Sequence, residues 1–329
     1  MNRQRLERFT QTPGPSGYED EIRAVIAAAL EDRVDEMRTD ALGSLVGFRN
    51  GANHDKTLLL AAHMDEIGLM VTHVEEKGFV RFTSVGGIRA VNSVGSRVRF
   101  ANGTLGIIAV ERRENASKIP QLRHLYIDVG ASSREDAPVR VGDTATFIGP
   151  LASQGSRWIS KAMDDRIGCY ILMELLERLE QPAHDVFFVF STQEEITLSG
   201  ARTSAFRIDP QMAISVDVTS TGDTPKALPM DVALGEGPAI KVKDSGMIAH
   251  PAVRDRMIEV ADAHEIPYQL EVLLRGSTDA AAMQLVRGGV PSGCVSIPCR
   301  YVHSTTETVD EADVEHAIEL LHAMIRTAS

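Results

Sequence analysis

Apolar residues along this chain follow patterns that differ between regions of the sequence. From about residue 154 onward, short apolar runs alternate with segments in which apolar residues recur at helical spacing. The apolar runs are 185–191, 211–217, 267–274 and 292–298, and the helical patterns cover 165–180, 252–265, 278–286 and 310–327. Such alternation is typical of a mostly parallel sheet with helices on both faces.

The N-terminal part of the chain has the same character. Residues 15–33 carry apolar side chains at helical spacing, and the apolar runs 44–50 and 56–63 are predicted strands separated by a turn. This segment is too short to form a domain by itself. We therefore expect residues 1–70 and 154–329 to fold together into one α/β domain.

Residues 71–153 are different, because they contain turn residues and short β-rich segments but no long helical pattern. The β-rich segments are 78–85, 96–111, 124–130 and 142–150. Asn102-Gly103 lies between two apolar runs, which is a strong hairpin signal. Insertions are tolerated where the chain ends of the host lie close together at the surface. We expect residues 71–153 to form a small β-rich domain inserted into the α/β domain.

Composition narrows the range of partners and locations. The 329 residues are 43% hydrophobic and carry a net charge of −12. Such a charge disfavours nucleic acid and anionic membranes as partners. The N-terminus lacks a signal-peptide pattern, and no early apolar run could span a bilayer. Cys169, Cys294 and Cys299 match no zinc or redox spacing, so we predict small buried side chains in a cytoplasmic protein.

Ionisable side chains follow the predicted strands at the points where those strands end, and one acidic pair precedes a predicted helix. The positions concerned are His63, Asp65, Asp164, Asp165, Glu194, Glu195, Asp217 and His303. Ligands bind beyond the carboxyl ends of the strands in open α/β sheets. We therefore expect these side chains to converge on one crevice.

Two imidazoles among several carboxylates are suitable ligands for Zn²⁺, Co²⁺ or Mn²⁺. Each pair by itself is more often a hydrogen-bonded histidine or a solvated acid, but here the pattern recurs at equivalent places in the sheet. The set contains no thiolate, which suits a catalytic site better than a structural zinc site. Because clustered carboxylates repel one another, two divalent ions would balance their charge. The sequence therefore predicts a metal centre.

Five motifs carry a resemblance to a known family. "HMDEIG" (63–68), "KAMDDR" (161–166), "QEE" with "GA" (193–195 and 200–201), "VDVT" (216–219) and "YVHS" (301–304) occur in this order. Together they resemble the tetrahedral, deblocking and glutamyl aminopeptidase family of dinuclear metallopeptidases, over essentially the whole chain. The resemblance implies a zinc-exopeptidase-like fold, a PDZ-like inserted domain, short peptide substrates, and homo-oligomers ranging from dimers to dodecamers.

The same resemblance implies a role for each matched position. His63 and Asp217 would bind one metal ion, Glu195 and His303 would bind a second, and Asp164 would bridge the two. Glu194 would be the general base, and Asp65 would orient the histidine ligand. The "GSTDA" stretch, residues 276–280, resembles a loop that lines the substrate cleft. Ile196-Thr197 and Ser277 depart from the residues usual in the family, and these differences bear on substrate preference.

Three other functions remain open on the sequence. A metal-dependent deacylase, or a hydrolase of a small modified peptide, would use the same ligands. A two-carboxylate glycosidase would need neither histidine, and the 5% aromatic content provides few sugar platforms. A non-enzymatic assembly or regulatory protein would need no free Glu194.

Overall fold

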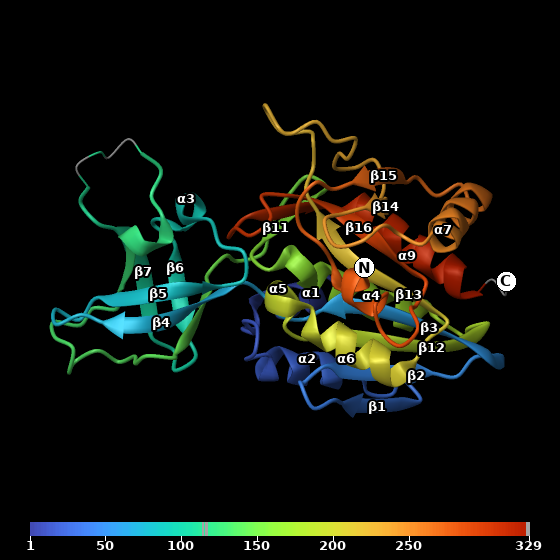
Figure 1. Cartoon of the computed structure of the whole chain (residues 1–329), viewed down its shortest axis with the longest axis horizontal. Helices are drawn as coiled ribbons and strands as arrows, with labels where there is room; N and C mark the ends of the chain where they lie inside the picture. Colours follow the sequence, from blue (N-terminus) through green and yellow to red (C-terminus); the bar gives the residue numbers. More distant parts are fainter. Residues whose placement is uncertain (114, 116–117, 327–329) are drawn as a thin grey trace.

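A large α/β unit and a small β-barrel, linked by short connections, make up the molecule (Figure 1). The structure is a computed structural model that describes residues 1–113, 115 and 118–326. The strands of the large unit are β1 (Glu36–Thr39), β2 (Leu45–Arg49), β3 (Asn53–His63), β10 (Ala152–Gln154), β11 (Arg157–Ser160), β12 (His184–Ser191), β13 (Met212–Thr219), β14 (Ala239–Lys243), β15 (Gln269–Val272), β16 (Ser292–Arg300) and β17 (Glu307–Asp310). Its helices are α1 (Arg3–Gln11), α2 (Asp20–Leu30), α4 (Met163–Arg178), α5 (Glu194–Thr197), α6 (Ser199–Ile208), α7 (Pro251–Ala263), α8 (Asp279–Met283) and α9 (Glu311–Arg326).

The sheet of the large unit is mixed. Its main path runs β1-β2-β12-β3-β13-β16-β17-β11-β10, and β14 and β15 branch from β16. Strands β12, β3, β13 and β16 are parallel neighbours, but the strands at both ends of the path pair antiparallel. The prediction of a mostly parallel sheet is therefore right for the centre only. Short connections, such as the one between β10 and β11, can join only antiparallel strands.

Helices cover both faces of this sheet, as predicted. Strand β3 shows how, because Leu60 and Ala62 join the core on one face while Leu59 and Ala61 join the core on the other. Buried side chains of α1, α2, α4, α7 and α9 belong to the first core, and those of α6 and α8 belong to the second. Strands buried on both faces appear in the sequence as continuous apolar runs. The central strands are therefore fixed between two layers of helices.

The β-rich segment forms a closed barrel with strand order β4-β5-β8-β7-β6-β9. These strands are β4 (Gly68–Val74), β5 (Val80–Val85), β6 (Arg97–Phe100), β7 (Leu105–Val110), β8 (Leu125–Asp128) and β9 (Thr144–Phe147), and the short helices near them are α3 (Ala90–Ser93) and η1 (Leu122–His124). The predicted hairpin at Asn102-Gly103 is confirmed by the antiparallel pairing of β6 with β7. Phe100, Ile108 and Phe147 belong to a core that is separate from those of the large unit.

Several elements were not predicted, and other predictions end at slightly different residues. The elements without a counterpart among the predictions are helices α1, α3, η1, α5 and α6 and strands β1, β4, β10, β11, β14 and β17. The last predicted helix is α9, and the final residue of that prediction, Thr327, lies outside the described residues. Cys169, Cys294 and Cys299 are buried and free, as expected. In the described part of the chain, no helix has the length and apolar character needed to cross a membrane.

Candidate metal centre

The predicted site residues meet where the four parallel strands end. The spatial order of these strands is β12-β3-β13-β16, and His63 at the end of β3 is in register with Ser191 at the end of β12. Glu194 and Glu195 begin α5 just beyond β12, and Asp217 lies near the end of β13. His303 follows β16 by three residues. Sheet topology therefore brings together residues that are up to 240 positions apart, from His63 to His303.

Asp164 lies between the two histidines. Its Oδ1 atom is 3.0 Å from Nε2 of His63, and its Oδ2 atom is 3.1 Å from Nε2 of His303. The backbone reaches this position just before the regular part of α4, where a cis peptide bond joins Asp164 to Asp165. One carboxylate therefore faces two imidazoles, with a separate oxygen for each.

Two groups of potential ligands share Asp164. The ligand atoms of His63, Asp164 and Asp217 lie within 4.8 Å of one another, and so do those of Asp164, Glu195 and His303. The five residues are the ones expected to hold metal. Each group offers one imidazole nitrogen and carboxylate oxygens, and no thiolate, which is a donor set for a divalent transition ion.

Glu194 belongs to neither group but lies beside both. Its Oε2 atom is 3.8 Å from Nε2 of His63, and its side chain is only 11% exposed. Burial, together with the nearby carboxylates of Asp217 and Asp279, raises the pKa of Glu194 well above its ordinary value. A carboxyl group with a raised pKa can accept and return a proton near neutral pH.

Asp65 contacts more than the histidine. The Nδ1 atom of His63 lies 3.1 Å from the backbone carbonyl of Asp65 and 3.4 Å from its carboxylate. The two carboxylate oxygens accept hydrogen bonds from the backbone N–H groups of Glu194 and Glu195, at 3.1 and 3.2 Å. The hydroxyl of Ser16 donates to the same carboxylate. Although burial alone would raise it, these contacts hold the pKa of Asp65 below its usual value.

Other groups around the centre were not predicted. Glu307 is buried and accepts hydrogen bonds from the backbone N–H groups of Asp164, at 3.0 Å, and His303, at 2.7 Å. The Nδ1 atom of His303 lies 2.7 Å from the carbonyl oxygen of Gly87, in the segment between β5 and α3. Asp165, by contrast, was expected in the crevice, and it accepts hydrogen bonds from the backbone of His63 and Gly168. The paired acids of "KAMDDR" made Asp165 a candidate from the sequence, but Glu307 is a single acid in "TTETVD" and has no such pattern around it.

Burial and charge show that this cluster suits cations. Burial and neighbouring carboxylates raise the pKa of Asp217 well above its ordinary value and raise that of Glu195. The Oε1 atom of Glu195 is buried and accepts no hydrogen bond within the described residues, although His303 Nε2 lies 3.2 Å away. Buried carboxylates that lack enough hydrogen-bond donors are costly unless a cation neutralises them. The residues present therefore fit divalent metal ions.

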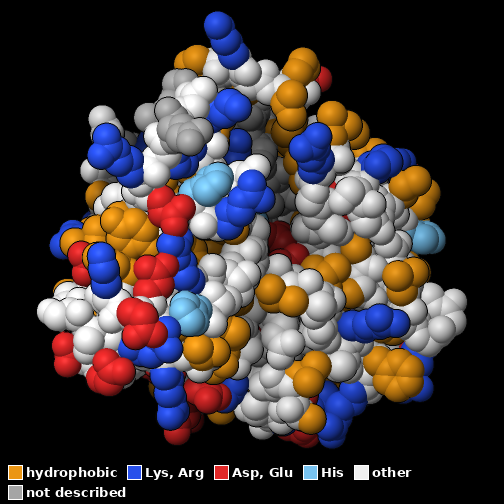
Figure 2. Space-filling model, turned by 60° about the vertical axis from the view of Figure 1, so that its left-hand side comes forward, with side chains coloured by type: hydrophobic (Ala, Val, Ile, Leu, Met, Phe, Trp, Pro, Cys, Tyr) orange, Lys and Arg blue, Asp and Glu red, His pale blue; other side chains and the backbone are white. Residues whose placement is uncertain are grey.

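The cluster lies at the floor of a cleft of about 590 Å³. Figure 2 shows acidic side chains in the depth of this hollow and Lys and Arg side chains on the surface around it. Arg275, Gly276 and Ser277 line the cleft, whereas Thr278 and Asp279 of the same stretch are buried. Arg300 lies outside this cleft lining and forms an ion pair with Asp223 through two of its nitrogens.

This chain is similar to known proteins in both sequence and structure. Residues 43–320 match the family model described as M42 glutamyl aminopeptidase. A protein of Acetivibrio thermocellus with a provisional aminopeptidase name is 47% identical over 318 residues, which is 96% of this chain and 96% of that protein.

Solved structures agree with this match. The aminopeptidase APDkam598 of the archaeon Desulfurococcus kamchatkensis superposes with a TM-score of 0.95 at 40% identity, covering 99% of this chain and 94% of the other. The TET1 peptidase of Pyrococcus horikoshii, described as assembling into a tetrahedron or a large octahedral shell, superposes with a TM-score of 0.89 at 32% identity. That alignment covers 99% of each chain.

Proposed function

Since this chain belongs to the M42 glutamyl aminopeptidase family of peptide hydrolases, we propose that it removes N-terminal residues from short peptides at a centre for two divalent metal ions. The observation that carries the proposal is the position of Asp164, whose two oxygens face His63 and His303 separately. A carboxylate that faces one imidazole with each of its oxygens suits two adjacent ions that share it.

The residues that would hold the ions follow from the two ligand groups. His63, Asp164 and Asp217 would hold one ion, and Asp164, Glu195 and His303 would hold the other, as Zn²⁺, Co²⁺ or Mn²⁺. When bound, such ions lower the pKa of a water molecule and polarise the carbonyl of the scissile bond. The proposed assignment of ligands matches the roles implied by the family resemblance.

Glu194 would move the proton. Its carboxyl group lies beside both ligand groups and stays outside them, so it is free to take a proton from the attacking water. The same group would then deliver that proton to the leaving amine. Asp65 supports this role, because its hydrogen bonds to the backbone of Glu194 and Glu195 fix the base and the adjacent ligand together. The two adjacent glutamates would therefore have separate roles: Glu194 would carry the proton and Glu195 would bind metal.

We further propose that the closed barrel, whose strands run from Gly68 to Phe147, is an inserted oligomerisation domain near the expected bounds of 71–153. The remainder of the chain, expected as residues 1–70 and 154–329, would form the catalytic domain, because Ala152 and Ser153 already belong to β10 of the large sheet. The closed barrel with its own core supports this division. Barrel strand β7 presents Leu105 and Ile107 to solvent with more than half of each side chain exposed, at 56% and 53%. The shells described for the Pyrococcus horikoshii relative support a homo-oligomer. The PDZ-like character and the cytoplasmic location remain predictions.

A metal-dependent deacylase on the same centre is the alternative, and one assay separates the two. The protein is stripped with a chelator and reloaded with Zn²⁺, Co²⁺ or Mn²⁺, then tested on aminoacyl chromogenic amides and their N-acetylated counterparts. Metal-dependent cleavage of the free-amine substrates alone is the expected result. Cleavage of the acetylated set would favour the deacylase, and no cleavage with any metal would reject the peptidase proposal.

A further inference from the structure

A second cavity opens beside the metal cleft, and none of the proposed ligands lines it. Its volume is about 470 Å³, and its lining is rich in hydroxyl groups, including those of Ser220, Thr221, Ser304 and Thr305. The cavity and the metal cleft share Arg89, Ser220 and Val302. The two spaces are therefore neighbouring parts of one surface depression, and a substrate held in the cleft could extend into the cavity.

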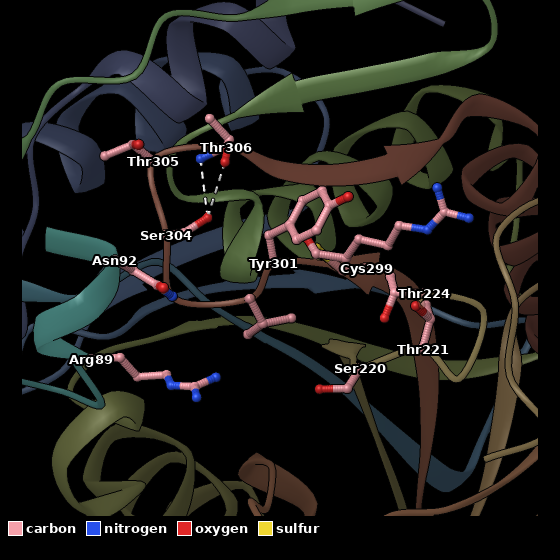
Figure 3. A pocket seen from close by; sticks show the side chains of 12 residues that line it. Arg89, Asn92, Ser220, Thr221, Thr224, Cys299, Tyr301, Ser304, Thr305 and Thr306 are labelled. Atoms are coloured by element: carbon pink, nitrogen blue, oxygen red, sulfur yellow. Dashed lines mark hydrogen bonds between the residues drawn. The ribbon is translucent and has the colours of Figure 1, made fainter. Parts of the chain in front are cut away.

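Arg89 is the cation of this cavity that remains available to a ligand. Figure 3 shows the Arg89 guanidinium and the Ser220 hydroxyl pointing toward one another across the cavity. Arg300 also lines the cavity, but two of its nitrogens already bind Asp223. Across the described part of the chain, no carboxylate forms an ion pair with Arg89, and no Asp or Glu lines the cavity.

Hydrogen bonds hold the backbone of Arg89 in place. Its carbonyl oxygen accepts hydrogen bonds from the Asn92 backbone at 3.0 Å and the Ser93 hydroxyl at 3.0 Å. Two residues earlier, the carbonyl of Gly87 meets the ring of His303 at 2.7 Å. Two residues span at most about 7 Å of backbone. The backbone of Arg89 therefore lies within about 10 Å of the ring of His303, a distance that about three extended peptide residues span.

We propose that this cavity, with Arg89 as its central residue, binds the C-terminal carboxylate of a short peptide substrate, an inference that rests on the proposed aminopeptidase function. Arginine binds carboxylates through two parallel hydrogen bonds, and the surrounding hydroxyls can donate to the same anion. A short peptide whose scissile bond lies over the proposed metal ligands would extend along the shared lining of Arg89, Ser220 and Val302 and place its free C-terminus in the cavity. The site would favour peptides of two to about four residues, whose C-terminus can reach it.

The test compares tripeptide free acids with their C-terminal amides, at an identical N-terminal residue, in the metal-loaded full-length protein. The acid should exceed the amide in kcat/KM by about tenfold or more, the range expected for one charge-assisted contact. Arg89→Gln should reduce this ratio to near one, mainly through KM. Arg140→Gln is the matched control, because Arg140 is a barrel arginine whose side chain is 90% exposed. That control should keep the wild-type ratio.

Three outcomes would overturn the proposal. The first is an acid-to-amide ratio of kcat/KM near one in the wild type. The second is an acid-to-amide ratio that stays at the wild-type value in Arg89→Gln, or that is lost in Arg275→Gln instead. The third is a selective effect of Arg89→Gln on substrates with an N-terminal Glu, which would assign the cavity to a side chain. Chromogenic aminoacyl amides carry no C-terminal carboxylate, so their cleavage by the wild type tests the aminopeptidase function separately. Cleavage of these amides without an acid preference would reject the subsite alone.

Discussion

Asp65 accepts a hydrogen bond from the backbone N–H of Glu194 at 3.1 Å. The other oxygen of the same carboxylate accepts from the next N–H, that of Glu195, at 3.2 Å. Asp65 therefore holds the first turn of α5, which carries the proposed base and one proposed ligand. This contact extends the role expected from the sequence, which was to orient His63.

Replacing Asp65 should therefore affect the base and the ligands together. Asp65→Asn keeps the shape of the side chain, but its amide group would face a backbone N–H that needs an acceptor. We expect kcat/KM and metal affinity to fall by about 10- to 100-fold, as for other residues that orient metal ligands. Kinetics and metal titration of the variant would show this. Asp55→Asn is the control, because the side chain of Asp55 is 67% exposed. Wild-type kcat/KM and metal affinity in Asp65→Asn would show that Asp65 does not position the base or the ligands.

Glu194→Gln should separate proton transfer from metal binding. The amide has nearly the same shape as the carboxyl group but cannot accept the proton from water. We expect kcat to fall by about 10²- to 10⁴-fold, while metal content and thermal stability stay close to those of the wild type. Turnover assays and elemental analysis of the same preparation would measure both quantities. Near-normal turnover in a metal-loaded variant would show that another group is the base.

Glu307 should control the second ligand group through the backbone. It joins the segments that carry Asp164 and His303, because it accepts one N–H from each. Glu307→Gln presents a donor to one of these N–H groups. We expect the affinity for the ion held by Asp164, Glu195 and His303 to fall by about 10- to 100-fold. The affinity for the other ion should fall less, because only Asp164 is common to both ligand groups. Calorimetric titration would resolve the two sites, and equal weakening of both would point to a general loss of structure.

The metal-free protein should lose stability as pH rises from 5 to 8. Burial raises the pKa of Glu194, Glu195 and Asp217 above their ordinary values, and raises that of Glu307 to about 8. In the unfolded protein, these carboxyl groups release their protons near pH 4. Over this interval the folded state therefore binds more protons than the unfolded state, and the free energy of unfolding falls with rising pH.

His303 also makes the metal-free protein less stable as pH rises. Burial opposes the charged form, yet the carboxylates of Asp164 and Glu195 raise the pKa of His303 to about 12. The stabilisation from its positive charge is complete below about pH 6.5 and is lost as pH rises toward its folded pKa. We expect a loss on the order of a few kcal/mol between pH 5 and 8 in chelator, measured by thermal unfolding. Added Zn²⁺ should reverse the trend, because metal affinity rises with pH. A free energy of unfolding that stays constant or rises between pH 5 and 8 in chelator would contradict this prediction.

The sequence was most informative where the side chains follow long buried strands. His63, Asp217 and the Glu194-Glu195 pair each follow an apolar run that forms a central parallel strand, so topology alone predicts that they meet. Asp164 was placed there by its motif and by the helix that follows it. These positions could be predicted from the sequence because the same pattern recurs on adjacent strands.

Other features depend on contacts between distant segments and leave no local pattern. Strand β12 lies between β2 and β3, although those two are consecutive in the sequence. Glu307 is an isolated acid on a four-residue strand, and only the fold shows that its carboxylate joins two backbone N–H groups. Arg89 likewise acquires its position from the contact of Gly87 with His303. Sequence periodicity reports burial, but it does not report which buried segments touch.

The proposed function depends on two metal ions that share Asp164. Anomalous diffraction from crystals of the protein loaded with Zn²⁺ or Mn²⁺ would locate these ions. Two anomalous peaks are expected in each chain, one contacting His63, Asp164 and Asp217 and the other contacting Asp164, Glu195 and His303. A single peak, or peaks away from Asp164, would contradict the proposal.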